Sequence, residues 1–242
     1  MAEVVPKPFL TAEWRDLAML NYAVDPAVLQ PLVPPGTELD FDRGETFLSV
    51  VGFLFLQTRV LGLPIPFHRN FEEVNLRFYV RRKTGEGWRR GVAFIREIVP
   101  RRAIALVARK FYDEPYVALP MRHALERTDD RLSVAYSWRR AGLWESLAMT
   151  ASGAAREIAA ASHEEFITEH YWGYTARGAQ SSEYSVEHPR WRFWPATTWD
   201  LKADVATLYG SIFVAPLSAA PASAFIAEGS HVTVRRRSRG IV

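Results

Sequence analysis

Four polar side chains share one face of a strand predicted over residues 71–82, FEEVNLRFYVRR. Successive side chains of a strand point to opposite faces, so this face carries Glu73, Asn75, Arg77 and Tyr79. Two interpretations stay open: an ordinary solvated face, or a face that lines a barrel interior and binds a small ligand. In a dry interior, the carboxylate of Glu73 and the guanidinium of Arg77 would shift each other's pKa.

Composition and spacing remove several other kinds of site. The chain has no cysteine, which excludes disulfides, thiolate zinc sites and cysteine nucleophiles. Its six histidines show no metal-ligand spacing, and we find no glycine-rich phosphate loop or nucleophile elbow. We therefore expect neither a metal site nor a cofactor. His170, in TEHYWGY, fits a buried cluster of polar and aromatic groups, and it is a lesser candidate for ligand binding.

The elements that must position these side chains are mostly strands. β-forming residues between turn signals predict strands over 14–24, 45–60, 71–82, 88–97, 132–140, 143–151, 183–194, 210–216 and 223–235. Short helices are predicted from Asp25–Pro26, over 101–112 and over 162–170. The loop KTGEG predicts a hairpin, and Gly52 indicates a bulge or a close backbone approach. The pattern favours one mainly β (α+β) domain over residues 1–242, a barrel or sandwich with a few short helices.

The charge pattern bears on partners and compartment. The net charge is +3, and the one dense basic run, RRRSR at 235–239, is expected to be a solvated tail. It has no interleaved aromatic residues to stack on bases, which argues against nucleic acid. We find no secretory signal and no apolar run long enough to cross a membrane, so we expect a soluble cytoplasmic protein without a membrane partner. A homo-oligomer is left open.

Eight segments, taken in order, resemble a known family. They cover nearly the whole chain: LNYAVDPAVLQPLVPPGTELD, ETFLSVVGF, FEEVNLRFYV, GVAFIREIV, ARKFYDEPY, EHYWGY, YSVEHPRW and SAFIAEGSHVTV. The chain is similar to the YqjF-like family of uncharacterised bacterial proteins, in the acetoacetate decarboxylase-like superfamily. This resemblance implies a closed antiparallel β-barrel with a central cavity.

The resemblance also shows where the chain departs from the decarboxylases. Those enzymes form a Schiff base through a lysine that follows a proline. The surroundings of this lysine lower its pKa, which makes it a better nucleophile. In the similar stretch here, ARKFYDEPY, Pro115 is followed by Tyr116, whose phenol cannot form a Schiff base. Their arginine after the tyrosine of the first strand is replaced by Ala23. Their carboxylate after an aromatic residue persists as Glu73 in FEEV.

Three functional hypotheses follow. In the first, the barrel cavity binds a small molecule, such as a carboxylate or keto acid, without Schiff-base chemistry. Glu73 and Tyr116 would then be the catalytic candidates, with a binding set of Arg77, Tyr79, Arg109 and His170. In the second, a decarboxylase or aldolase-like enzyme acts through Lys110. In the third, the chain is a non-catalytic interaction protein whose arginine-rich end contacts an anionic partner.

Overall fold

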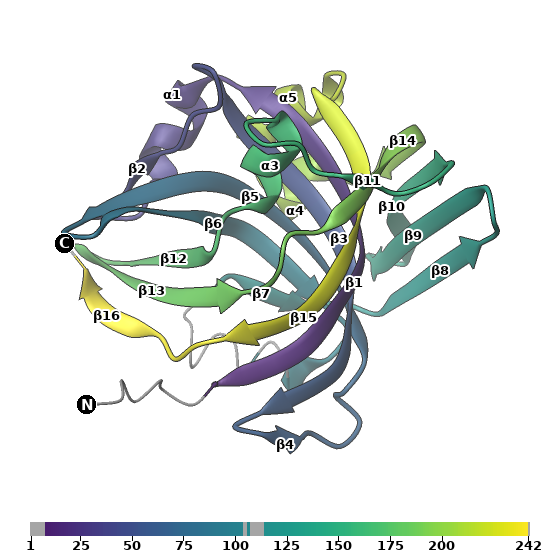
Figure 1. Cartoon of the computed structure of the whole chain (residues 1–242), viewed down its shortest axis with the longest axis horizontal. Coiled ribbons are helices and arrows are strands. Elements are labelled where there is room, and N and C mark those ends of the chain that lie inside the picture. Colours follow the sequence, from purple (N-terminus) through teal and green to yellow (C-terminus); the bar gives the residue numbers. More distant parts are fainter. Residues whose placement is uncertain (1–7, 104–105, 107–113, 242) are drawn as a thin grey trace.

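The computed structural model describes residues 8–103, 106 and 114–241 (Figure 1). The strands are β1 (Leu10–Val24), β2 (Glu38–Leu39), β3 (Thr46–Val60), β4 (Leu63–Pro64), β5 (Phe71–Thr84), β6 (Gly87–Val99), β7 (Tyr116–Ala118), β8 (Met121–Arg127), β9 (Arg131–Arg140), β10 (Leu143–Ser152), β11 (Arg156–Glu157), β12 (Trp172–Arg177), β13 (Gln180–Glu187), β14 (Arg192–Lys202), β15 (Ser223–Val234) and β16 (Ser238–Ile241). The helical segments are α1 (Pro26–Leu29), η1 (Gln30–Leu32), α3 (His163–Thr168), α4 (Val205–Leu208), η2 (Ser211–Phe213) and α5 (Val214–Ser218).

The long strands form a ring. Hydrogen bonds join them in the order β13–β12–β6–β5–β3–β1–β15, and β13 pairs again with β15. The expectation of a mainly β fold with a few short helices is confirmed. One neighbouring pair, β6 with β12, is parallel, so the ring is not wholly antiparallel. That the ring is a closed barrel stays a prediction.

A second sheet leaves the ring at β14. The first part of β14 pairs with β15, and its later residues pair with β10. Strands β10, β9 and β8 continue from there and lie to one side of the ring (Figure 1).

Two hydrophobic cores occupy the two faces of the long strands. On β5, Val74, Leu76, Phe78 and Val80 belong to an outer core that includes side chains of β9, β10 and α5. The residues of β1 and β3 that alternate with the outer set belong to an inner core, together with Phe166 of α3. The period of two expected for β5 is therefore confirmed, and its polar face is directed to the inside of the ring.

Local signals in the sequence explain several boundaries. The Asp25 carboxylate accepts a hydrogen bond from Ala27 N at 2.8 Å and starts α1, and the Ser162 hydroxyl caps α3 through Glu165 N at 3.1 Å. The prediction of a close approach at Gly52 is confirmed, since a Cβ there would lie 2.6 Å from the ring of Tyr136. β5 and β6 form the expected hairpin, with a shorter turn than KTGEG indicated.

Three expectations are wrong. The strand predicted over 183–194 is two strands, β13 and β14, because the chain leaves the sheet at 188–191, where Pro189 cannot donate to a ladder. The segment 210–216 is helical rather than extended, and it packs Phe213 and then Leu217 onto the outer core. The arginine-rich end is not a free tail: Arg235 pairs with Glu187 at 2.7 Å, and β16 adds to β13.

Two further expectations concern helices. The helix predicted over 101–112 falls largely on residues 104–105 and 107–113, which lie outside the described residues. Over the described ranges, none of the helices has the length and apolar character needed to cross a membrane.

Candidate functional site

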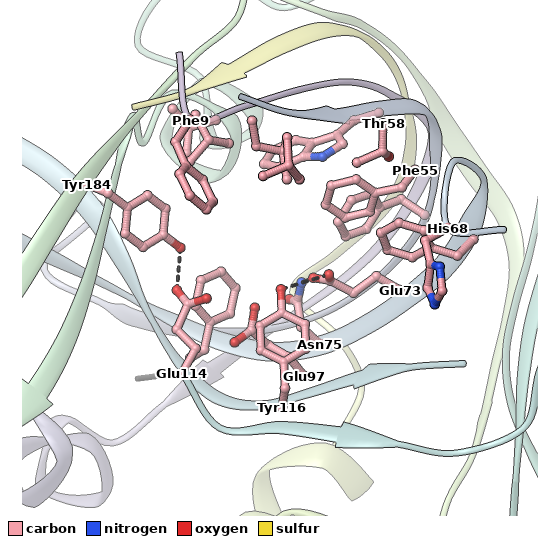
Figure 2. Close-up of a pocket in the computed structure, with 18 of the residues that line it drawn as sticks. Phe9, Phe55, Thr58, His68, Glu73, Asn75, Glu97, Glu114, Tyr116 and Tyr184 are labelled. Carbon is pink, nitrogen blue, oxygen red and sulfur yellow. Dashed lines mark hydrogen bonds between the residues drawn. The ribbon is translucent and has the colours of Figure 1, made fainter. Parts of the chain in front are cut away.

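A cavity of about 200 Å³ lies inside the ring (Figure 2). Most of its wall is apolar and comes from the inner core, with side chains that include Phe9, Leu10, Trp14, Leu17, Phe53, Phe55, Val60, Ile65, Phe71, Phe94, Val186 and Val234. Most of the polar groups lie on one side of the cavity, across from Phe9 and Thr58, and Tyr184 reaches toward Glu114 from the flank (Figure 2). We call them the glutamate cluster: Glu73, Asn75, Glu97, Glu114, Tyr116 and Tyr184.

Strand pairing brings the glutamate cluster together. Asn75 on β5 is paired with Glu97 on β6, and Glu97 is paired in turn with Tyr116 on β7. Glu73 lies two residues before Asn75 on the same face of β5. Glu114 comes just before β7, and Tyr184 reaches the group from β13.

Hydrogen bonds link the cluster in two groups. Glu73 accepts from Asn75 Nδ2 at 3.0 Å through Oε1 and from the Tyr116 hydroxyl at 3.0 Å through Oε2. Glu114 Oε1 accepts a short hydrogen bond from the hydroxyl of Tyr184. Two acceptors, Asn75 Oδ1 and Glu97 Oε2, are buried and have no hydrogen-bond partner among the described residues.

Burial keeps these carboxyl groups protonated over much of the neutral range. It raises the pKa of Glu73 to about 7, although bonds from Asn75 and Tyr116 and the charge of Arg77 oppose the rise. Burial also raises the pKa of Glu114 to about 8, partly offset by the hydrogen bond from Tyr184.

The pKa values of Glu97 and Tyr116 are also raised. Burial, and then the charges of Glu114 and Glu73, raise the pKa of Glu97 well above its ordinary value. Burial and the neighbouring glutamates also raise the pKa of the Tyr116 phenol, which therefore stays a hydrogen-bond donor. At neutral pH, a glutamate with such a pKa can either donate a hydrogen bond as a carboxylic acid or accept one as a carboxylate. A small shift of its pKa decides which form is present.

Only some of the site residues predicted from the sequence line the cavity. Glu73, Arg77 and Tyr116 line the cavity, and Arg77 also approaches Ile167 O of α3, at 3.5 Å. Tyr79 and His170 are buried against α3, and neither is among the described residues that line the cavity. Arg109 lies outside the described residues, as does Lys110.

Tyr79 and His170 belong to a second polar group, the histidine cluster: Asp40, Ser49, Tyr79, Arg90 and His170. Asp40 Oδ2 accepts from Arg90 Nε at 2.6 Å and lies 3.1 Å from His170 Nε2. Burial would raise the pKa of Asp40, but the hydrogen bonds from His170 and Arg90 lower it overall. Burial lowers the pKa of His170 to about 4, so the ring is neutral and donates to Asp40 through Nε2.

Sequence reasoning missed Glu97, Glu114 and Tyr184. Glu97 faces the cavity because a bulge between Leu76 and Arg77 of the hairpin shifts the register by one residue on β6. Without that shift, Arg96 would stand opposite Asn75. Glu114 had a signal in the sequence, since it stands two residues before Tyr116 in the stretch that resembles the decarboxylase motif.

In the described part of the chain, we find no group of three or more metal-ligating side chains placed to hold a metal ion.

Solved structures with this arrangement belong to one fold. An acetoacetate decarboxylase from Legionella pneumophila is 14% identical, with a TM-score of 0.65 over 99% of this chain and 93% of that one. An acetoacetate decarboxylase-like enzyme from Sphingomonas wittichii RW1 is 16% identical, with a TM-score of 0.66 over 99% and 95%. The enduracididine biosynthesis enzyme MppR, complexed with pyruvate, is 13% identical, with a TM-score of 0.65 over 98% and 92%. Identities this low show the fold alone.

Sequence comparison gives the family. The uncharacterized protein YqjF of Bacillus subtilis (strain 168) is 34% identical over 110 residues, which are 45% of this chain and 44% of that protein. The match therefore spans less than half of either. The model of the DUF2071 family, described as an uncharacterized conserved protein, matches residues 11–231. The chain belongs to this DUF2071 family, is similar to YqjF over part of its length, and shares its fold with the acetoacetate decarboxylase-like structures.

Proposed function

We propose that the chain binds a small, largely apolar molecule inside the ring, and that Glu73 and Tyr116 hold its polar end. One observation carries the proposal: the polar groups of several strands converge on one side of an otherwise apolar cavity of about 200 Å³. Ligand pockets commonly combine apolar walls with a few polar groups that fix orientation. The binding involves no Schiff base at the position of Tyr116, because a phenol cannot form one.

A thermal-shift screen tests this function. The library covers small carboxylates, keto acids, alcohols, ketones and amines, and binders raise the melting temperature because they bind only the folded state. Tyr116→Phe and Glu73→Gln should abolish the shift for the strongest binder. Tyr209→Phe is the matched control, since its buried hydroxyl has no partner among the described residues and lies in the outer core. A library without a binder, or binders indifferent to both cavity variants, would reject the proposal.

A second candidate is that the same cavity catalyses a proton transfer on its ligand. The observation in its favour is the pKa of Glu73, about 7, beside the neutral phenol of Tyr116. A general acid or base is most effective when its pKa lies near the working pH. Exchange of ligand C–H protons for deuterium, followed by NMR, should then occur with the parent chain and be lost in Glu73→Gln.

The lysine hypothesis has its own test. The described cavity wall contains no lysine, and Lys83 and Lys202 are exposed elsewhere. Lys7 and Lys110 both lie outside the described residues, and Lys110, in the stretch that resembles the decarboxylase motif, is the candidate for Schiff-base chemistry. Borohydride trapping with acetoacetate or pyruvate, read by mass spectrometry, should give no adduct if the first proposal is correct. An adduct at Lys110 would favour the enzyme instead.

A further inference from the structure

We propose that the cavity is selective for an organic cation: a primary or secondary ammonium group on a small apolar body, held beside Glu73 and Tyr116 with its N–H groups directed at the neighbouring Asn75 and Glu97. This inference rests on the proposed function and names the class of ligand. It differs from the carboxylate or keto acid expected from the sequence.

Five buried polar atoms of the lining residues have no hydrogen-bond partner among the described residues. Trp14 Nε1 and Arg77 Nε are donors, Thr58 Oγ1 can be either, and the other two, Asn75 Oδ1 and Glu97 Oε2, are oxygens on paired strands of the glutamate cluster. Asn75 is 1% exposed, and its Nδ2 already donates to Glu73, which leaves Oδ1 without a donor among the described residues. Glu97, also 1% exposed, has an unpartnered Oε2 on the paired position of the next strand. Buried polar atoms are seldom left without a hydrogen bond, so this pair calls for a ligand that donates (Figure 2). An ammonium group donates and accepts nothing.

The charges around the cavity favour a cation as well. Glu73, Glu97 and Glu114 line it, and Arg77 is the one arginine or lysine among the described lining residues. The other titratable or charged groups that line it or act on its glutamates are His68, Tyr116, Tyr184 and Arg237. A carboxylate ligand would add a negative charge to a wall with three acids and one arginine, whereas an ammonium would add a second positive charge beside those acids.

The walls suit the rest of such a ligand. Phe55 and Phe71 stack with centroids 4.7 Å apart, and Trp14 packs edge-on against Phe55 at 5.6 Å. Aromatic faces attract cations as well as apolar groups. A cavity of about 150 Å³ holds benzene in another protein. The present cavity of about 200 Å³ therefore has room for a ring and a short amine.

Ammonium binding should release a proton. The raised pKa values of the glutamates mean that most of them hold a proton in the empty cavity below pH 7. A bound ammonium favours ionisation of a carboxyl group beside it, so the acid proton leaves to solvent while the ligand keeps its own. A neutral acceptor, such as a ketone, would instead need the acid protonated.

Calorimetry with three matched probes tests the inference. Benzylamine, benzyl alcohol and benzoate share one ring and differ in the charge of the head group. At pH 6 we expect benzylamine to bind at least about tenfold more tightly than either of the others. In two buffers of different ionisation enthalpy, its binding should release up to about one proton. Glu97→Gln should weaken benzylamine about tenfold, whereas the control Glu72→Gln, whose carboxylate contacts His123 outside the cavity, should leave it within about twofold.

The wild-type measurements decide the question even if Glu97→Gln fails to fold. Tighter binding of benzyl alcohol or benzoate, or binding of benzylamine without proton release, overturns the inference and leaves the proposed function standing. Failure of all three probes also overturns the inference. The proposed function is rejected separately, when no member of the wider library binds in the cavity.

Discussion

The histidine cluster and the glutamate cluster lie against the same strand, β5, and bury their charges in opposite ways. In the histidine cluster one carboxylate, Asp40, is matched by the Arg90 guanidinium and the neutral His170 ring. In the glutamate cluster three acids face one arginine, and two acceptor atoms have no donor among the described residues. The charge of Asp40 is therefore matched within the protein, although His170 Nδ1 has no partner among the described residues, whereas the acids of the glutamate cluster outnumber the basic side chains that line the cavity.

The difference gives the two clusters opposite pH dependence. In the folded chain the pKa of His170 is lowered to about 4, so the unfolded chain binds the proton first as the pH falls from 6.5. Stability from this cluster is therefore lost between about pH 6.5 and 4. In the glutamate cluster the folded-state pKa values are raised, so the folded chain holds protons longer. Stability from that cluster is lost as the pH rises from 4.5 to about 8.

The largest expected effect comes from neutralising the glutamate cluster. Glu114→Gln keeps the acceptor for Tyr184 and removes a group whose pKa is raised from 4.5 to about 8. We expect the free energy of unfolding at pH 8 to rise by roughly 4 kcal/mol, with little change at pH 4. Urea unfolding across this pH range measures it.

Glu86→Gln is the control for this experiment, because Glu86 is exposed in the hairpin turn. It should change the free energy of unfolding by less than about 0.5 kcal/mol at either pH. A Glu114→Gln protein with the same pH profile as the parent would show that the cavity acid is ionised at little cost, and the contrast between the clusters would disappear.

A smaller effect is expected from the histidine cluster. Asp40→Asn keeps the shape but removes the negative charge that accepts from Arg90 and His170. We expect a loss of about 2 kcal/mol in the free energy of unfolding at pH 7. The control Glu38→Gln breaks an exposed pair with Arg81 on the same edge of the sheet and should cost less than about 0.5 kcal/mol. Equal losses in the two variants would contradict a special role for the buried acid.

The sequence predicted the fold where side-chain alternation was long and regular. The polar and apolar faces of β5 follow from the period of two alone, and the strands predicted over 132–140 and 143–151 are β9 and β10. The segment 210–216 was predicted as a strand because Ile212, Phe213 and Val214 are β-formers. It is helical, since the packing of Phe213 and Leu217 onto the outer core overrides that preference. Short apolar runs carry too little periodicity to separate the two structures.

The sequence predicted only some of the residues that line the cavity. Glu73, predicted from the face of β5, and Tyr116, predicted from the resemblance, both line the cavity, and their functional roles stay predictions. Glu97 was not found, since a one-residue bulge decides which face it takes and no glycine or proline marks the position. The separation of Tyr79 from Glu73 also has no signal in the sequence, because both share one face of β5 and only α3 divides that face into two environments.

Another variant removes a single hydrogen bond from the histidine cluster. Tyr79→Phe removes the hydrogen bond between the Tyr79 hydroxyl and Ser49, 2.6 Å away, and leaves the ring packed against His170 at 4.8 Å. We expect a loss of about 1 kcal/mol, measured by urea unfolding at pH 7. Ligand binding in the cavity should be unchanged. A loss of binding in this variant would show that the two clusters act as one site.

The smallest and most specific effect is a pKa change in the glutamate cluster. The Tyr116 hydroxyl donates to Glu73 and so favours its ionised form, because the bond is stronger to a carboxylate. Tyr116→Phe should therefore raise the pKa of Glu73 above about 7 while changing the stability near pH 5 by less than about 1 kcal/mol. The titration of the Glu73 side-chain carboxyl carbon, followed by NMR in the parent chain and the variant, measures the shift. An unchanged or lowered pKa would contradict the conclusion that the hydrogen bond from Tyr116 favours the ionised form of Glu73.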